Sequence, residues 1–199
     1  GSEMCIRDSN YSAWEVEPTI TYLPIPYAGI TMGFLFCNTI EDESYSGVSK
    51  DQRWRWSSDD DSPLCHHFAL RPAIQLATPA LKLGKDKDMG LSFILSPGLT
   101  IPLSVNQRLN ISYYPNVSGI WSSQRFDQVK NRGGRAIFYH IKGMFTLDLG
   151  EQYTLSAGYT FSDFDMYSGG RNMVVEGKKL TMPAFRFMHS FFVSLGYRF

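Results

Sequence analysis

Hydrophobic residues occupy every second position over several stretches of this chain. The C-terminal stretch, residues 185–199, is the clearest, because apolar side chains stand at its odd positions and only His189 and Phe192 fall on the wrong face. Successive side chains of a β-strand point to opposite faces of the sheet. The period of two therefore predicts a strand with one apolar face and one small or polar face.

Seven stretches alternate in this way. Most are about 9 to 14 residues long, close to the roughly 9 to 11 tilted residues that cross a bilayer and longer than the 5 to 6 residues typical of globular strands. The stretches are 14–22, 30–36, 68–77, 91–103, 137–149, 153–162 and 185–199. Strand length therefore favours a barrel in a membrane over a soluble sandwich.

The connections between these stretches alternate in length. The short ones are 23–27, 84–89 and 150–151, and the long, polar ones are 38–66, 104–134 and 163–184. Outer-membrane barrels combine short periplasmic turns with long extracellular loops. The predicted fold class is therefore all-β, an antiparallel up-and-down transmembrane β-barrel.

Seven strands make an odd count, whereas bacterial barrels use even numbers. The strand missing from the count is an ascending one before Asn10. Residues 1–9, GSEMCIRDS, lack the features of a secretory signal and resemble a translated sequencing-adapter remnant. We therefore set 1–9 aside as a non-native leader and assign 10–199 to one N-terminally truncated barrel domain of about eight strands. The short alternating stretch 108–114 is interpreted as a hairpin extension outside the membrane.

Composition agrees with this interpretation. Aromatic residues make up 15% of the chain and charged residues only 19%, against about 25% charged residues in an average soluble domain. The formal net charge is zero, which gives no electrostatic footprint for nucleic acid. Mean hydropathy is −0.20 and no apolar run approaches the roughly 20 residues of a transmembrane helix.

The last nine residues, FFVSLGYRF, carry a more specific signal. They resemble the C-terminal signal of outer-membrane barrel proteins, and this resemblance implies recognition by the barrel-assembly machinery. The matching positions are Phe191, Val193, Leu195, Tyr197 and Phe199. From about Phe68 onward, the chain also resembles a broad group of uncharacterised small outer-membrane β-barrel proteins, for which no active residues are assigned.

The opposite faces of the strands supply the expected barrel interior. An eight-stranded barrel is just wide enough for its lumen to be filled by side chains. The polar residues expected to face the lumen are Glu15, Glu17, Arg71, Gln75, Lys142, Asp148, Arg186 and Arg198. We expect Arg186 and Arg198 to pair there with carboxylates, because an Arg facing lipid near the bilayer midplane costs about 2 to 4 kcal/mol.

Candidate chemistry is sparse. Cys65, His66 and His67 lie near an Asp run at 59–61, but adjacent strand residues point to opposite sides and an Asp run is typical of a solvated loop. His189 and Ser190 likewise face opposite sides and cannot form a catalytic dyad. We expect no metal, no cofactor and no enzyme activity.

Two further features concern the long connections. Cys5, Cys37 and Cys65 are an odd and widely spaced set, so both a Cys37–Cys65 disulfide and free thiols stay open. Trp54 and Trp56 alternate with arginines, which suits an aromatic girdle at the outer headgroup boundary, near lipopolysaccharide phosphates.

The sequence thus predicts a barrel in the bacterial outer membrane that acts as an envelope scaffold or a surface-binding protein through its extracellular loops. Outer-membrane lipid, lipopolysaccharide and the barrel-assembly machinery are the expected partners, and nucleic acid is not one. The loops carry no recognisable ligand motif. A narrow porin or small-ligand transport barrel is the alternative function, and an outer-membrane lipid-modifying enzyme is a more remote one.

Overall fold

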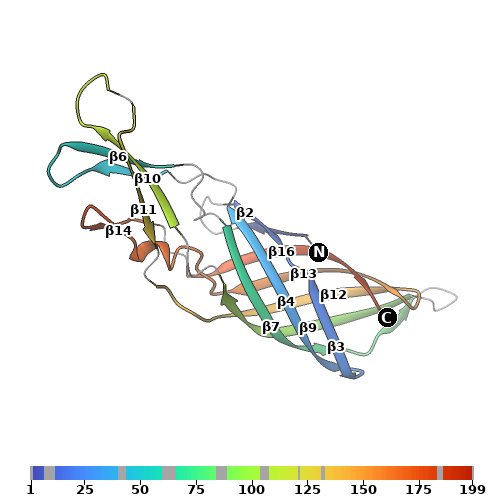
Figure 1. Ribbon diagram of the computed structural model, residues 1–199. Helices are drawn as coiled ribbons and strands as arrows, with labels where there is room; N and C mark the ends of the chain where they lie inside the picture. Colours follow the sequence, from blue (N-terminus) through green and yellow to red (C-terminus); the bar gives the residue numbers. More distant parts are fainter. Residues whose placement is uncertain are drawn as a thin grey trace.

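The computed structural model describes residues 2–6, 12–39, 44–59, 66–83, 89–103, 108–120, 122–130, 133–182 and 186–198, with the backbone alone at 2–6, 12, 39 and 66. The protein is all-β, and its strands form a long curled sheet, a smaller sheet beyond one end of it, and a short hairpin (Figure 1). In the described ranges, no helix combines the length and apolar character needed to cross a bilayer.

The curled sheet is antiparallel throughout and contains ten strands. They are β1 (Ser2–Ile6), β2 (Ser12–Val16), β3 (Thr19–Ile25), β4 (Ala28–Thr39), β7 (His66–Ala77), β8 (Leu81–Leu83), β9 (Met89–Pro102), β12 (Phe138–Leu149), β13 (Tyr153–Ser162) and β16 (Met188–Tyr197). Pairing runs in the order β12-β13-β16-β1-β2-β4-β7-β9, and β9 also pairs with β12, so the ladder returns to its first strand. The up-and-down barrel class predicted from the sequence is confirmed.

The join between the two ends of the chain is a short part of this ladder. Strand β1 pairs with β16 over Ser190–Val193 and with β2 over Ser12–Val16. It therefore occupies the ascending position missing from the sequence-based count, although it comes from the residues set aside as a leader. That residues 1–9 are a non-native leader stays a prediction. Among the described strands, β3 has a single partner, β4.

One predicted strand, 14–22, is broken into β2 and β3. Both halves pair with β4, at Phe36–Thr39 and at Ala28–Gly33 respectively. Pro18 lies at the break and has no N–H to donate to the ladder, which favours an interruption there. Its carbonyl still accepts a hydrogen bond from the Phe34 amide at 3.0 Å.

The described short turns, at 26–27 and 150–152, lie at one end of the barrel sheet, and the described parts of the long connections lie beyond the other (Figure 1). The turn between β12 and β13 is tight because Gly150 adopts a φ of 71°, a left-handed conformation that glycine takes without strain. Between β7 and β9 the structure adds the short strand β8 (Leu81–Leu83), which pairs with Met89–Leu91 of β9 across the predicted connection 84–89.

The smaller sheet has the order β11-β10-β6-β5. Its strands are β5 (Ser46–Val48), β6 (Trp54–Ser58), β10 (Arg108–Pro115) and β11 (Arg125–Lys130). Residues 108–114 lie outside the barrel sheet, as predicted. Strands β5 and β6, which come from a different long connection, were not predicted. Trp56 is buried in this sheet, and Trp54 packs against the same cluster, so neither forms the girdle suggested by the sequence.

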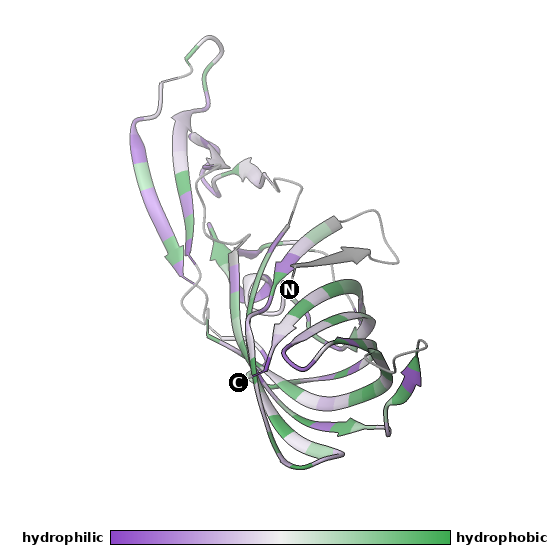
Figure 2. Cartoon of the chain, turned by 90° about the vertical axis from the view of Figure 1, so that its right-hand side faces the viewer, coloured by the Kyte–Doolittle hydropathy of each residue, from purple (hydrophilic) through white to green (hydrophobic). Residues whose placement is uncertain are grey.

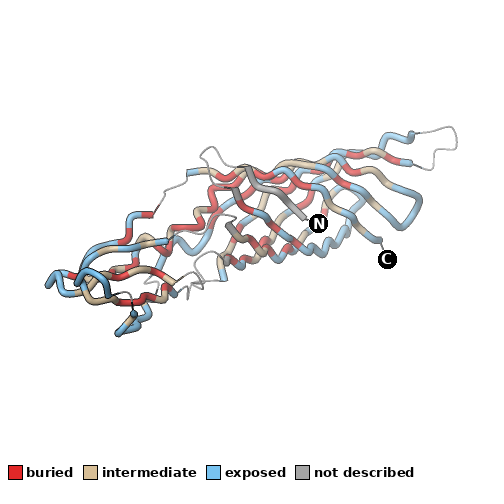
Figure 3. Tube along the Cα trace, turned by 90° about the horizontal axis from the view of Figure 1, so that it is seen from above, coloured by how far each residue is buried: buried red, intermediate tan, exposed pale blue. Residues whose placement is uncertain are grey.

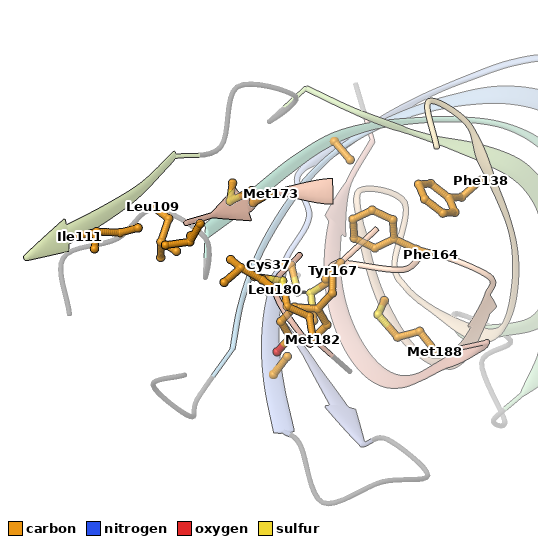
Figure 4. Packing of buried hydrophobic residues seen from close by; sticks show 14 of the residues in the cluster. Cys37, Leu109, Ile111, Phe138, Phe164, Tyr167, Met173, Leu180, Met182 and Met188 are labelled. Carbon is orange, nitrogen blue, oxygen red and sulfur yellow. Dashed lines mark hydrogen bonds between the residues drawn. The ribbon is translucent and has the colours of Figure 1, made fainter. Parts of the chain in front are cut away.

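The third long connection folds back over the barrel opening. It contains a 3-10 turn, η2 (Gly170–Asn172), and a hairpin of β14 (Val174–Val175) and β15 (Lys178–Lys179). The hairpin turns through Glu176 and Gly177, both with positive φ. Figure 4 shows apolar side chains of this segment gathered at the opening with residues of the barrel wall. The buried members of this cluster from the segment are Phe164, Met166, Tyr167, Met173, Val175, Leu180 and Met182.

Candidate functional site: an apolar barrel surface around a charged interior

The outer face of the barrel is apolar along its length. Burial alternates along the strands, so that one side chain faces inward and the next is open to the surroundings (Figure 3). Figure 2 shows the apolar positions recurring along the same strands. Among the described residues of β4, β7, β9, β12, β13 and β16, the outward positions carry no Asp, Glu, Lys or Arg. A water-exposed protein surface rarely has an apolar area of this extent.

The C-terminal positions that resemble an assembly signal belong to this outer face. Phe191, Val193, Leu195 and Tyr197 are exposed by 57%, 56%, 71% and 50% respectively. Phe199 lies outside the described residues. The outward orientation predicted from the alternation is therefore observed at the four described positions. Their recognition by an assembly machinery stays a prediction.

Aromatic rings pair on the outer face near both ends of the barrel, and the Phe93–Phe145 pair, with 5.2 Å between the ring centroids, lies between these two levels. Near the short turns, the Tyr153 and Tyr197 rings lie 5.4 Å apart. Near the long connections, Phe161 lies 5.0 Å from Phe187 and 5.4 Å from His189. A strand rises about 3.3 Å per residue and is tilted by about 40° in such barrels, so Tyr153 and Phe161 of β13 are separated by roughly 20 Å along the barrel axis. Barrel proteins of outer membranes have an apolar band of about 25 Å between two aromatic girdles.

The interior of the barrel contains a buried network of charges. One oxygen of Glu17, Oε2, accepts hydrogen bonds from Arg71 Nη1 at 2.8 Å and from Lys142 Nζ at 2.6 Å. Arg71 Nη1 also lies 3.7 Å from Glu15 Oε2, which accepts a longer hydrogen bond from Ser190. All four charged side chains are buried, and two carboxylates balance two cations. Burial of charges is tolerated only when they are paired in this way.

Neutral side chains, both polar and apolar, fill much of the rest of the described lumen. The Gln75 side-chain oxygen accepts hydrogen bonds from Thr31 at 3.1 Å and from Thr21 at 3.4 Å. His140 is buried and its Nδ1 lies 3.1 Å from the Thr100 hydroxyl. Side chains thus pack the described lumen, and several of its polar groups hydrogen-bond one another, as expected for a narrow barrel.

The three remaining lumen candidates, Asp148, Arg186 and Arg198, lie at the ends of the barrel or beyond them. Arg198 pairs with Asp148, a predicted partner, at 2.6 Å, at the short-turn end where Arg198 is exposed to solvent. The placement of Arg186 in the lumen was wrong. Strand β16 begins only at Met188, so Arg186 lies beyond the end of the barrel wall, is exposed, and stacks 5.3 Å from the Phe187 ring. Water can solvate the guanidinium there, and pairing with a buried carboxylate is not required.

The opening on the long-connection side is filled by the segment 163–182. Phe164 packs edge-on against Phe138 of the wall at 5.2 Å, and the carboxylate of Asp163 pairs with Arg135. In the smaller sheet, Tyr113 is buried and its hydroxyl donates to Glu176 Oε1 at 3.1 Å. Burial, together with this neighbouring carboxylate, raises the pKa of Tyr113 to about 12. The segment therefore joins the smaller sheet to the barrel.

The remaining sequence candidates do not assemble into a reactive site. Ser190 points into the barrel towards Glu15, whereas His189 lies on the outer face beside Tyr159, so the two are separated by the sheet. The described residues contain no group of three or more His, Cys, Asp and Glu side chains placed to hold a metal ion. Cys65 and residues 60–61 lie outside the described residues, as does any disulfide that would involve Cys65.

No family model matches this chain, and neither a curated protein nor a solved structure matches it. Fold and geometry therefore define its class. The chain is an all-β protein with an antiparallel, up-and-down barrel sheet, apolar on the outside and charged on the inside.

Proposed function

We propose that this chain is a β-barrel of the bacterial outer membrane that presents a folded surface module on its long connections and acts there as an envelope scaffold or surface-binding protein. One observation carries the proposal. The barrel is apolar where a soluble protein is polar and charged where a soluble protein is apolar. Such a distribution is stable only if the solvent around the barrel is itself apolar, as in a bilayer.

The second element of the proposal is the surface module. The smaller sheet and the segment 163–182 share one buried apolar cluster with the barrel opening. Loops that share a core with the barrel are held in one arrangement, which suits binding to a partner or to neighbouring envelope components. We propose lipopolysaccharide and outer-membrane lipid as the surroundings of this module, with no enzyme activity.

Transport remains an alternative function, but the geometry supports it less. The barrel opening is filled by buried side chains of the segment 163–182, and the lumen contains the Glu17, Arg71 and Lys142 network. A narrow porin requires a continuous water path through both regions. Conductance steps in a planar lipid bilayer with the purified, folded chain would favour transport over a scaffold role.

The membrane proposal is tested by a pair of matched substitutions. Phe145 is 60% exposed in the middle of the outer face of β12, and Phe126 is 70% exposed on β11 of the smaller sheet. If the barrel is surrounded by lipid, Phe145→Arg costs about 2 to 4 kcal/mol and lowers the yield of folded protein in phospholipid vesicles. Phe126→Arg, at a position outside the bilayer, leaves that yield unchanged.

The yield is measured as the fraction that migrates as folded, heat-modifiable protein on a gel without boiling. If the barrel were surrounded by water, Phe145 and Phe126 would both be ordinary surface positions and would tolerate Arg equally well. Equal yields for the two variants would therefore contradict the membrane proposal.

The assembly signal has its own test in cells. Deleting Phe199 should reduce the amount of protein recovered from the outer membrane, while refolding of the purified chain in detergent is unchanged, because the terminal residue serves recognition by the assembly machinery rather than the intrinsic fold. Equal recovery with and without Phe199 would refute this role.

A further inference from the structure

Three side chains that can bind soft metal ions lie near one another where the segment 163–182 fills the barrel opening. Cys37 of β4 and His67 of β7 are directly opposite each other in the ladder, and both are buried, with 0% and 2% exposure. Opposite residues on neighbouring antiparallel strands have Cβ atoms about 4.5 to 5.5 Å apart on the same face. The Cys37 thiol donates to Met166 Sδ at 3.3 Å, and Met166 is 3% exposed.

The segment that carries Met166 also contacts the histidine. The Phe164 ring lies edge-on to the His67 ring, with 6.2 Å between their centroids. Met166 follows Phe164 by two residues, so one short stretch of chain lies over both wall residues. Figure 4 shows Cys37 and Phe164 within the buried cluster at the opening.

We propose that Cys37, His67 and Met166 form a binding site for a soft monovalent metal ion, Cu(I) or Ag(I). Thiolate and thioether sulfur select Cu(I) over harder cations, and imidazole suits copper as well. The Cys37 thiol loses its proton to solvent when it binds the ion, as metal-bound thiolates do. Two sulfur ligands, each about 2.3 Å from a metal, are roughly 3.3 to 4 Å apart at angles between 90° and 120°. The observed sulfur–sulfur distance lies at the lower end of that range.

The donor set disfavours the harder divalent ions. Zinc sites use Cys, His and carboxylate ligands, and calcium and magnesium require oxygen. The described residues contain no group of three or more His, Cys, Asp and Glu side chains suited to a metal. The thioether of Met166 is the third donor here, and it is a ligand for soft ions.

Such an ion would connect two strands of the barrel wall to the segment 163–182. All three donors are nearly inaccessible, so loading requires the segment to lift, and binding then holds it down. The site does not depend on the proposed membrane location, because every donor lies inside the protein. If the chain binds no such ion, the comparison of folding yields between Phe145→Arg and Phe126→Arg still tests the membrane proposal independently.

The test uses a background chain with Cys5→Ser and Cys65→Ser, so that Cys37 is its only thiol, folded in detergent and verified by its heat-modifiable migration. Silver nitrate is added in chloride-free buffer, unbound ion is removed by desalting, and silver is counted by elemental analysis. We expect one Ag(I) per chain, and at least tenfold weaker binding in Met166→Leu and in His67→Gln. Met32→Leu, at an exposed position of the outer face, is the matched control and should bind as the background chain does.

A second measurement reports on the segment itself. Arg171, Lys178 and Lys179 offer trypsin sites within it, and Ag(I) should slow their cleavage in the background chain and not in Met166→Leu. X-ray absorption of the Cu(I)-loaded chain, kept reduced with ascorbate, should show two sulfur ligands and one nitrogen ligand.

Three results would overturn the proposal. They are the absence of bound silver, equal silver binding by the background chain and Met166→Leu, and a copper spectrum with one sulfur ligand. Leu conserves the volume of Met in a packed core, so Met166→Leu should still fold. This variant therefore tests the metal site even if His67→Gln does not fold.

Discussion

The buried charge network predicts a large and specific loss of stability when one of its members is neutralised. Glu17→Gln removes the carboxylate oxygen that accepts hydrogen bonds from both Arg71 and Lys142. Breaking a buried ion pair from one side leaves an uncompensated charge and costs about 3 to 5 kcal/mol. Here two cations lose their shared partner, and the more distant Glu15, at 3.7 Å from Arg71, recovers only part of that loss.

The control is an arginine–carboxylate ion pair at the surface. Arg125 and Asp127 lie 3.6 Å apart on β11, and both side chains are about half-exposed. Exposed pairs contribute about 0.2 to 1 kcal/mol. Asp127→Asn should therefore change stability by less than 1 kcal/mol.

The assay is reversible unfolding by urea of the chain folded in lipid vesicles, followed by tryptophan fluorescence and by heat-modifiable migration. With a denaturant slope of about 1 to 3 kcal/mol per molar urea, Glu17→Gln should lower the midpoint by at least roughly 1 M. The double variant Glu17→Gln with Lys142→Met should recover part of the loss, because one unpaired buried cation is then removed. Equal midpoints for Glu17→Gln and Asp127→Asn would refute the reasoning.

Two other predictions concern packing inside the barrel and the module above it. A Cβ at Gly33 would overlap Glu17 Oε1, so Gly33→Ala should destabilise the folded chain in the same urea assay, whereas Gly143→Ala, where the nearest atom is at 3.5 Å, should be nearly neutral. The raised pKa of Tyr113, about 12, means that the fold favours the neutral phenol, so this contribution is complete below the ordinary pKa near 10 and is lost as pH rises towards 12. Tyr113→Phe should abolish this alkaline loss while costing about 0.5 to 1.5 kcal/mol at neutral pH through the lost hydrogen bond to Glu176; an unchanged alkaline profile in Tyr113→Phe would assign the loss to another group.

The alternation of the sequence determined the barrel strands and their faces. In a strand the side-chain period is two, so a stretch such as 153–162 assigns Leu155 outward and Ser156 inward whatever its partners are. The same reasoning placed Glu15, Glu17 and Arg71 inside. Connection lengths further separated the end with short turns from the end with long loops. These properties are local, and the sequence expresses them position by position.

Where the alternation was weak or ended, the sequence alone was insufficient. Arg186 has an even number, as do the inward-facing positions of β16. The alternation of faces applies only within a strand, however, and β16 begins at Met188. Pro18 interrupts the first predicted strand without ending its pairing with β4. Strand ends depend on hydrogen bonds to neighbouring strands, and the pattern of a single strand does not contain that information.

Only the tertiary structure decided how the long connections are used. The pairing of β6 with β10 joins residues more than 50 positions apart, and the alternation within each short strand does not specify which strand it pairs with. The same holds for Cys37, His67 and Met166, whose side chains come from two strands and a distant segment. Their meeting results from the register of β4 with β7 and from the burial of apolar side chains of 163–182 in the barrel opening. The sequence determined what each strand presents on either face, and long-range pairing and burial decided which of those faces meet.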